Sequence, residues 1–279
     1  MCDSCLKPFL KWAGGKRQLL PEITKRLPRD IQNYTYYEPF LGAGAVFFSL
    51  QPKKAVINDC NRQLIMTYRV IKEQREEVIT LLREYQQKNA EAYYYQIRNL
   101  DRDQEAFAKM TDVEKAARLI FLNKTCYNGL YRVNAHGLFN APYGKYKNPA
   151  ICEETLLRHI GEYLISNDIA IANEDFEAVL ADIEKPGFIY FDPPYHSPDK
   201  KNFTGYQAER FDEAEQERLR DAFAKAADSG AQCLLSNADT PFIRKLYKRF
   251  TIHSVQAKRA INSNAAGRGL VGEVLVQSW

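Results

Sequence analysis

The residue types best suited to chemistry stand together in Asp192-Pro193-Pro194-Tyr195, directly after the apolar run 187–191. The exocyclic amine of a nucleobase is a poor nucleophile because its lone pair is delocalised into the ring, so an enzyme must hold both of its N–H groups. Asp192 can accept one N–H and the Pro193 carbonyl the other, while Tyr195 offers a flat face to an extruded base. The prolines fix φ and hold these acceptors in place. The simpler interpretation of the same residues is a turn that ends a strand.

A second candidate element is the glycine turn Glu38-Pro39-Phe40-Leu41-Gly42-Ala43-Gly44, which follows an aromatic extended segment. Its glycines let a ligand approach the backbone at the start of a helix. Phe47 stands where a dinucleotide fingerprint needs a small residue, which disfavours a nicotinamide-dependent oxidoreductase. Asp59 ends the next apolar run and could either accept hydrogen bonds from ribose hydroxyls or cap the following helix.

The other candidate motifs give weaker evidence for a function. Gly14-Gly15-Lys16 lacks the P-loop spacing, and Arg17 stands where a Ser or Thr would hold magnesium, so we exclude hydrolysis of nucleoside triphosphates. Lys16 could instead pair with a ligand carboxylate. The four histidines lie in no nucleophile motif, and Cys2 with Cys5 forms a lone C-x-x-C that cannot complete a zinc site. We therefore expect no metal.

The composition predicts a folded protein, since the 279 residues are 45% hydrophobic and 27% charged. No apolar run approaches the roughly 18 residues that span a bilayer, and the first residues lack the apolar stretch of a signal peptide. The six cysteines are scattered, which suits a reducing compartment. We expect a cytoplasmic protein that does not associate with membranes.

The charge distribution points to nucleic acid. The net charge is only +4, but residues 115–152 and 240–272 contain no acidic residue. In the first of these tracts the basic residues Lys115, Arg118, Lys124, Arg132, Lys145 and Lys147 alternate with the aromatic residues Phe121, Tyr127, Tyr131, Phe139, Tyr143 and Tyr146. Such tracts neutralise phosphates, and their aromatic side chains can stack on bases or wedge between them. A solvated basic face on an ordinary enzyme is the alternative interpretation.

The candidate residues fall at the ends of predicted strands. Strand patterns cover 34–40, 55–59, 169–172, 187–191, 231–236, 251–255 and 273–276, and helical patterns cover 45–50, 64–82, 86–102, 213–227 and 241–247. This alternation predicts an α/β fold with a doubly wound, mostly parallel sheet. Ligands bind such sheets beyond the carboxyl ends of the strands, where Gly42, Asp59 and Asp192 all fall. Residues 66–150, which are loop-rich from 128 to 149, interrupt the alternation. We expect them to form an inserted, mainly helical domain, with 1–65 and 151–279 as the catalytic domain.

Five segments, in this order, resemble the motifs of the Dam-type DNA adenine-N6 methyltransferases, a family that includes restriction-modification members acting on GATC. They are Phe9–Lys16, Glu38–Gly44, Asn58-Asp59, Asp175-Phe176 and Asp192–Tyr195. The resemblance spans nearly the whole chain. Residues 127–132 and 137–147 resemble the target-recognition region of that family, and Arg259 with Ile261–Asn264 resembles its tail motif.

The resemblance implies a Rossmann-like methyltransferase fold and S-adenosylmethionine as cofactor, with S-adenosylhomocysteine as product and no metal. It implies that the cofactor-binding residues are Trp12, Lys16, Glu38, Phe40, Gly42, Gly44, Asp59, Asp175, Phe176 and Asp192. Trp12 and Lys16 would lie near the methionine end, Asp59 at the ribose, and Asp175 with Phe176 at the adenine.

The same resemblance implies double-stranded DNA as partner and a set of recognition residues: Lys11, Tyr127, Asn128, Leu130, Arg132, Pro142 and Tyr146. Lys11 would read the first guanine pair, Tyr127 would wedge into the duplex, and Asn128 would lie near the vacated partner of the adenine. Leu130, Arg132 and Pro142 would read the outer bases. A bidentate arginine on guanine is worth about 1–3 kcal/mol of discrimination, which makes Arg132 our first choice for specificity. Lys145 stands where arginine is expected.

The expected activity is therefore transfer of a methyl group to N6 of adenine, within GATC, after base flipping. Asp192, Pro193 and Tyr195 would be the catalytic residues. Two alternatives stay open: a cytosine-N4 methyltransferase, to which the same pair of acceptors applies, and a non-catalytic DNA-binding regulator, which would use only the basic tracts. A monomer can complete every one of these roles.

Overall fold

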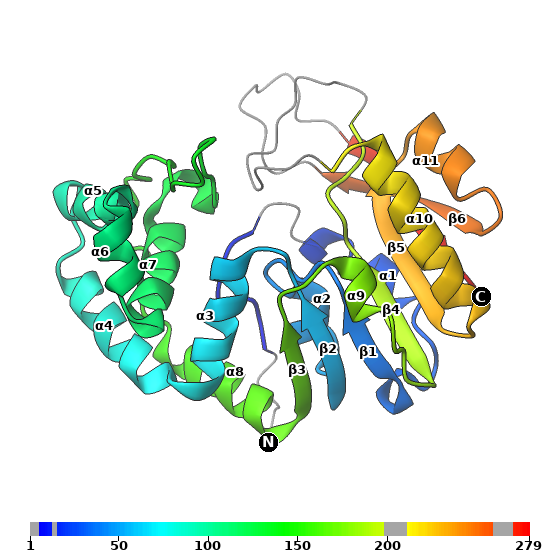
Figure 1. Ribbon diagram of the computed structural model, residues 1–279, viewed down its shortest axis with the longest axis horizontal. Helices are drawn as coiled ribbons and strands as arrows, with labels where there is room; N and C mark the ends of the chain where they lie inside the picture. Colours follow the sequence, from blue (N-terminus) through cyan, green and yellow to red (C-terminus); the bar gives the residue numbers. More distant parts are fainter. Residues whose placement is uncertain (1–5, 13–15, 198–210, 259–269) are drawn as a thin grey trace.

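The structure, a computed structural model, describes residues 6–12, 16–197, 211–258 and 270–279 (Figure 1). Cys2, Cys5 and the predicted tail motif at Arg259 and Ile261–Asn264 lie outside these residues. No helix in the described ranges is long and apolar enough to cross a membrane.

The described residues form one seven-stranded sheet in the order β3-β2-β1-β4-β5-β7-β6. The strands are β1 (Thr35–Glu38), β2 (Lys54–Asn58), β3 (Asp168–Ala172), β4 (Gly187–Phe191), β5 (Gln232–Ala238), β6 (Thr251–Lys258) and β7 (Leu270–Gln277). Strands β1 to β5 are parallel, and β7 runs antiparallel to both β5 and β6. The predicted mostly parallel sheet is confirmed. The antiparallel strand follows from the short connection between β6 and β7, since a parallel pair needs a longer crossover.

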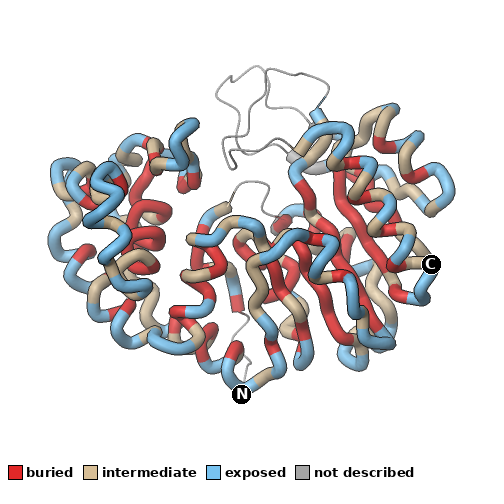
Figure 2. Tube along the Cα trace, in the orientation of Figure 1, coloured by how far each residue is buried: buried red, intermediate tan, exposed pale blue. Residues whose placement is uncertain are grey.

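Helices cover both faces of the sheet, as a doubly wound fold requires. On one face Tyr36, Phe188 and Leu234 join a core cluster with α1 (Leu20–Thr24), α2 (Ala45–Leu50), α3 (Arg62–Glu73) and α8 (Glu154–Ser166). On the other face Ile189 and Leu235, the alternate residues of the same strands, pack against α9 (Phe176–Val179), α10 (Glu213–Asp228) and α11 (Pro241–Leu246). Figure 2 shows the central strands β1, β4 and β5 as almost continuously buried. The alternation of side chains along each strand thus builds two cores.

The predicted insertion forms a helical lobe beside the sheet (Figure 1). It contains α4 (Arg75–Gln87), α5 (Glu91–Asn99), α6 (Gln104–Lys109), α7 (Asp112–Thr125) and the short 3-10 turns η3 (Leu100–Arg102) and η4 (Tyr127–Gly129). The helical patterns above do not include α7, because it is buried on nearly every side from Ala116 to Asn123 and so has no amphipathic stripe. Its start carries a capping box between Thr111 and Glu114.

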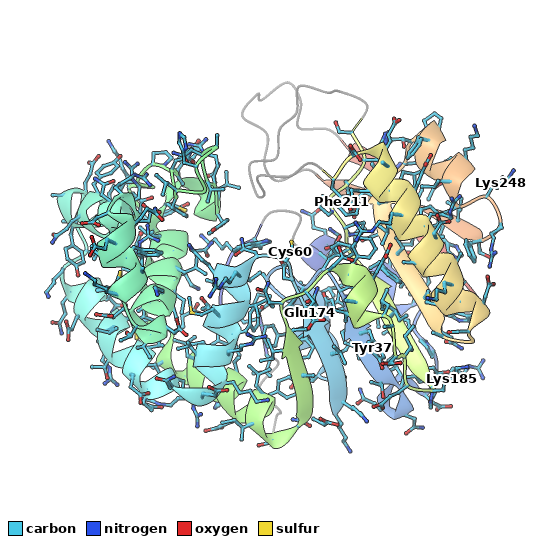
Figure 3. The ribbon with its side chains drawn as sticks, viewed as in Figure 1. Tyr37, Cys60, Glu174, Lys185, Phe211 and Lys248 are labelled. Carbon is cyan, nitrogen blue, oxygen red and sulfur yellow. The ribbon has the colours of Figure 1, made fainter. Side chains whose placement is uncertain are left out.

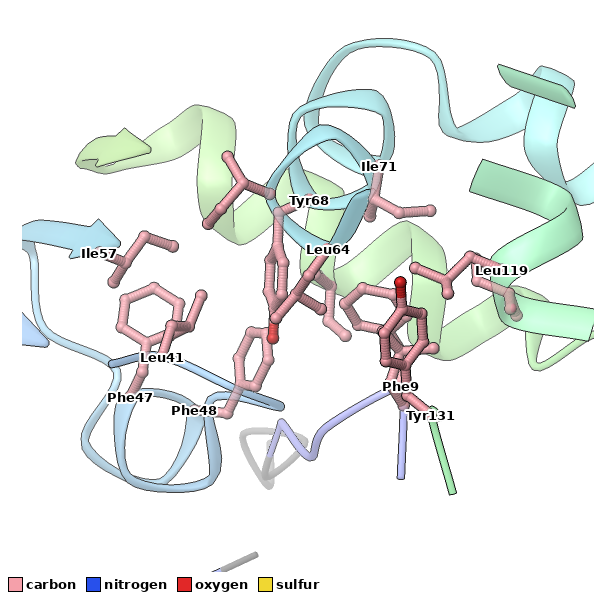
Figure 4. Close-up of a cluster of buried hydrophobic side chains, with 14 of the residues drawn as sticks. Phe9, Leu41, Phe47, Phe48, Ile57, Leu64, Tyr68, Ile71, Leu119 and Tyr131 are labelled. Carbon is pink, nitrogen blue, oxygen red and sulfur yellow. The ribbon is translucent and has the colours of Figure 1, made fainter. Parts of the chain in front are cut away.

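The helical lobe and the sheet share one core. Phe48 on α2, Tyr68 on α3 and Leu119 on α7 belong to the same buried cluster (Figure 4). The predicted domain boundary between residues 65 and 66 falls inside α3, which packs on α7 and α8 at once. Helix α3 therefore packs against both parts. The division into two domains stays a prediction.

Candidate active site and DNA-facing segment

The turns that follow β1, β2 and β3 meet at one edge of the sheet. Asn58, 1% exposed, ties them together: its amide donates to Pro39 O (3.0 Å) and Glu174 O (3.1 Å), and its Oδ1 accepts from Glu174 N (2.9 Å). Figure 3 shows Cys60, Glu174 and Phe211 at this edge. Parallel strands bring their carboxyl ends to the same side, so the predicted ligand edge is formed by these turns.

Asp59 accepts a hydrogen bond from the backbone of the glycine turn. Gly42 and Gly44 have φ of +52° and +68°, which favours glycine. Asp59 Oδ2 accepts from Gly42 N and its Oδ1 accepts from Asn61 N, both at 2.9 Å, and burial raises the pKa of the Asp59 carboxyl. Asn61, rather than Asp59, caps α3 by accepting from Leu64 N at 3.0 Å. Asp59 is therefore a half-buried acceptor beside the turn.

Trp12 lies between the glycine turn and the helical lobe. Its ring stacks on Tyr131 with centroids 4.9 Å apart, and a Cβ added at Gly42 would approach Trp12 Cδ1 to 3.1 Å. A side chain at position 42 would therefore crowd the indole. Two predicted cofactor residues, far apart in the sequence, are thus brought together.

Aromatic rings surround the start of α9. Phe40 packs on Phe176 (centroids 5.3 Å apart) and on Phe211 (5.8 Å), and the Arg218 guanidinium lies 4.3 Å from the Phe176 ring centroid. Arg218 also forms ion pairs with Asp175 and Glu177. Burial tends to raise the pKa of Asp175, but the bonds from Arg218 and from Glu177 N outweigh it and hold that pKa below its usual value. Phe211 and Arg218 belong to no motif, so sequence reasoning missed them.

Asp192 shares a largely buried ion pair with Lys16. Asp192 Oδ1 lies 2.7 Å from Lys16 Nζ and accepts from Ser236 Oγ at 3.1 Å. Burial raises the pKa of Asp192, while Lys16 and Ser236 oppose the rise. Lys16 Nζ also lies 4.6 Å from the Tyr195 ring centroid, and the Tyr195 hydroxyl donates to Glu273 Oε2 at 2.8 Å. The carboxylate and the aromatic face thus flank one position, which a cationic N–H donor already fills.

Two fully buried amides fix the loop after β4. Gln216 Nε2 donates to Pro194 O at 2.8 Å, Asn237 Nδ2 donates to Gln216 Oε1 at 2.9 Å, and Asn237 Oδ1 accepts from His196 N at 3.0 Å. No hydrogen bond from any other described residue reaches the Pro193 carbonyl. That carbonyl is therefore held in place yet free to accept. Gln216 and Asn237 carry no sequence signal, because polar residues in α10 and β5 are indistinguishable from surface positions.

Glu38, the last residue of β1, points into the core. Its side chain is 2% exposed and accepts from the Tyr36 hydroxyl at 2.7 Å. Burial raises the pKa of the Glu38 carboxyl well above its usual value. Its predicted contact with a cofactor is neither made nor excluded by these bonds and stays a prediction.

The segment after α7, residues 126–147, forms an irregular hairpin that we call the recognition segment. Its two sides pair at Cys126 with Tyr143 and at Val133 with Phe139. Tyr127 is 57% exposed, and its N–H donates to Pro142 O at 2.8 Å. Asn128 and Arg132 are exposed, Leu130 and Tyr146 are half-buried, and Pro142 is exposed. The predicted recognition residues other than Lys11 thus occur on one hairpin, where each is exposed or half-buried.

Lys11 joins this hairpin from the amino-terminal part of the chain. Asn123 Oδ1 accepts from Lys11 N at 2.8 Å and Asn123 Nδ2 donates to Lys11 O at 2.7 Å. Lys11 Nζ lies 5.0 Å from the Tyr146 ring centroid, and a Cβ at Gly129 would come within 2.4 Å of Lys11 Cδ. The side chain of Lys11 therefore lies on the backbone of the recognition segment.

The structure corrects the interpretation of the first basic tract. Arg118 is 1% exposed and pairs with Asp101 at 2.8 Å, and Lys124 pairs with Glu153 at 2.6 Å, so neither cation is available to DNA. Phe121, Tyr131 and Phe139 are core residues, not stacking platforms. Their acidic partners lie outside the tract in sequence, which is why composition alone overestimates its positive charge.

The second tract differs, because its paired cations stay at the surface. Arg244 pairs with Asp239 at 2.5 Å and Arg249 pairs with Asp228, and these two arginine side chains are 44% and 52% exposed. Arg259 and Arg268 lie outside the described residues.

Across the ranges that the structure describes, no group of three His, Cys, Asp or Glu side chains could hold a metal ion.

Comparison with known proteins agrees with this geometry. Residues 12–261 match the model of the D12 class of N6 adenine-specific DNA methyltransferases. The chain is 43% identical to the type II methyltransferase M1.LlaDCHI of Lactococcus lactis subsp. cremoris, covering 98% of this chain and 96% of that protein. It is 41% identical to the type II methyltransferase M.MjaIII of Methanocaldococcus jannaschii (92% and 93% covered). It is 34% identical to the DNA adenine methylase of Escherichia coli K12 (96% and 94%).

Proposed function

The chain belongs to the D12 class of N6 adenine-specific DNA methyltransferases, and on this premise we propose that it methylates the adenine of GATC in duplex DNA after flipping that base out of the helix. Membership favours adenine over the cytosine-N4 alternative and an enzyme over a non-catalytic regulator. The observation that carries the proposal is the Lys16 ammonium, which donates to Asp192 and lies against Tyr195. An N–H donor beside a carboxylate and an aromatic face is what a flipped adenine would supply.

The residues present fit S-adenosylmethionine, whose sulfonium methyl is the electrophile that this family transfers. Glycine at position 42 lets the turn approach Trp12 closely, where a Cβ would crowd the indole, and the packed rings of Phe40 and Phe176 present an apolar surface suited to a flat base. We propose that Asp59 accepts from the ribose hydroxyls and that Asp175 caps the adenine end. The proposed set is completed by Gly44, Glu38, Lys16 and Asp192.

We assign the catalytic roles to Asp192, Pro193 and Tyr195. Asp192 and the Pro193 carbonyl accept the two N–H groups of N6, which favours a pyramidal, nucleophilic nitrogen aimed at the methyl group. Tyr195 stacks on the extruded base and offsets part of the few kcal/mol that flipping costs. As the N–C bond forms, the bond between the methyl group and the sulfonium would break, with neutral S-adenosylhomocysteine as the leaving group. The positive charge passes to the nitrogen, and the surplus proton leaves afterwards. Lys16 must leave Asp192 before the base enters, and a ligand carboxylate is its natural next partner.

The exposed recognition residues support DNA reading by the recognition segment and Lys11. We propose that Tyr127 wedges into the duplex and Asn128 lies near the orphaned partner base. Lys11, Leu130, Arg132, Pro142 and Tyr146 then contact the bases and flanking backbone. One copy of the chain supplies all of these groups, which favours a monomer, and its DNA substrate favours a cytoplasmic location.

Base flipping is tested with 2-aminopurine in place of the target adenine, because this base fluoresces more strongly when it is unstacked. We expect binding to raise the fluorescence of a GATC duplex, and Tyr127→Ala to reduce this rise while leaving cofactor affinity unchanged. An unchanged fluorescence on saturated binding would contradict flipping.

A further inference from the structure

A buried charge cluster underlies the recognition segment. Asp101 on η3 is 3% exposed. Its Oδ2 lies 2.8 Å from Arg118 Nη2, and its Oδ1 accepts from Arg102 Nη1 at 2.6 Å. Arg118 is anchored further by donating to Ile97 O (2.9 Å) and Arg98 O (2.7 Å). A buried ion pair is a poor way to gain stability, because desolvation offsets most of its attraction. The cluster therefore suggests a role in fixing geometry.

The cluster hydrogen-bonds to both the N–H and the carbonyl group of Phe139. Asp101 Oδ2 accepts from Phe139 N at 2.8 Å, and Arg102 Nη2 donates to Phe139 O at 2.6 Å. The Tyr94 hydroxyl donates to Ala141 O at 2.8 Å, two residues further along. Charged side chains thus replace the neighbouring strand that a regular sheet would supply to this part of the recognition segment.

Phe139 is connected directly to the proposed base reader. Its neighbour Asn140 donates its backbone N–H to Arg132 O at 2.9 Å. In return Arg132 Nε donates to Asn140 Oδ1 at 2.7 Å and Arg132 Nη2 donates to Asn140 O at 3.1 Å. Asn140 therefore sets the direction of the Arg132 guanidinium. The backbone position of Asn140 is in turn set by the hydrogen bonds that hold Phe139.

We propose that Asp101, Arg102 and Arg118 form a clamp that aims Arg132, and that Arg102 is a specificity-positioning residue that touches no base itself. The inference rests on the proposed function, because it takes Arg132 as a base reader. A bidentate contact to guanine depends on direction as well as distance. Loosening the clamp lowers discrimination without removing any group that meets DNA.

Arg102→Met is the test variant, since Arg102 is partly exposed and its loss leaves the buried Asp101–Arg118 pair intact. Lys109→Met is the matched control: it removes one cation from the same lobe, where Lys109 pairs with the exposed Glu105 on α6. Amide hydrogen exchange of Phe139 reports the clamp without any DNA. We expect exchange to be roughly tenfold faster in Arg102→Met, unchanged in Lys109→Met, and partly restored in Arg102→Lys.

Discrimination is then measured as the ratio of methyl transfer to GATC and to duplexes with one altered pair. We expect Arg102→Met to reduce this ratio by roughly tenfold. The loss should occur at the same base pair as in Arg132→Ala. The double variant should discriminate no worse than Arg132→Ala alone. Affinity for S-adenosylmethionine should not change.

Each outcome is decisive. Unchanged exchange at Phe139 overturns the clamp. Faster exchange at Phe139 with full discrimination overturns the positioning role of the clamp. Additive losses of discrimination in the double variant overturn it as well. If Arg132→Ala keeps full discrimination while Arg102→Met loses it, the clamp stands and the proposed role of Arg132 fails.

Discussion

Lys16 Nζ lies 2.7 Å from Asp192 Oδ1, so the amino-terminal segment and the end of β4 share an ion pair at the centre of the proposed active site. The lysine side chain is 7% exposed and the aspartate side chain 20%. Lys16 therefore balances the charge of Asp192 before any substrate arrives. It also occupies the position that we assign to the adenine amine.

This pair predicts the pH dependence of the reaction. Asp192 must be ionised to accept an N–H, and its pKa is raised by burial, so turnover falls as the pH drops through that raised value. Lys16 opposes the rise in the free protein, so Lys16→Met should move the acid limb of kcat/KM to higher pH. The measurement is kcat/KM for the DNA duplex against pH, which reports the groups of the protein before the base enters. Lys25→Met, which removes an exposed lysine paired with Glu22, should leave the limb in place. A limb that moves to lower pH in Lys16→Met would contradict this account.

Arg132→Ala should weaken selectivity at a single base pair by about 1–3 kcal/mol, since one bidentate contact is lost. Lys147→Ala removes an exposed cation and should weaken binding equally for every sequence. Competition binding with duplexes altered at one pair at a time measures both effects. Uniform weakening by Arg132→Ala would make Arg132 a phosphate contact instead.

Arg218→Met should raise KM for S-adenosylmethionine by roughly three- to tenfold without changing kcat, because Arg218 stacks on Phe176 and holds Asp175. Arg220→Met is a matched control on the same helix, where Arg220 pairs with the exposed Asp221. Steady-state kinetics at saturating DNA separates KM from kcat. A fall in kcat with unchanged KM would remove Arg218 from the cofactor site.

Leu119→Ala should lower the free energy of unfolding by about 2–5 kcal/mol, because Leu119 is 1% exposed within the core that the sheet and the helical lobe share. Ile165→Ala, at a side chain that is 55% exposed, should change it little. Because the core is common to both parts, denaturant unfolding should follow one transition by fluorescence and by circular dichroism. Two separated transitions would show that the lobe folds independently.

The sequence predicts the elements whose signals are local. The strand 187–191 agrees with β4 because an apolar run ends at two prolines, and the turn at Gly42 follows from residues that tolerate positive φ. These local signals are enough to place Asp192 and Asp59 at the ligand edge of the sheet.

Long-range pairings carry no such signal. Arg118 counts as a free cation in the sequence, but Asp101 neutralises it inside the core. Gln216 and Asn237 support the loop after β4 through hydrogen bonds between α10, β5 and the loop itself, and nothing in their sequence spacing predicts this. The residues that we propose for the chemistry can therefore be recognised from local patterns, whereas those that hold them in place depend on contacts between distant parts of the chain.

The most direct test is transfer of labelled methyl groups from S-adenosylmethionine to two duplexes that differ only in the presence of GATC, followed by nucleoside analysis. We expect N6-methyladenine in the GATC duplex alone. Asp192→Ala should lower this transfer by about two to three orders of magnitude or more while still binding the duplex. Equal labelling of both duplexes would contradict GATC specificity, and label in cytosine, or undiminished transfer by Asp192→Ala, would contradict the proposed chemistry.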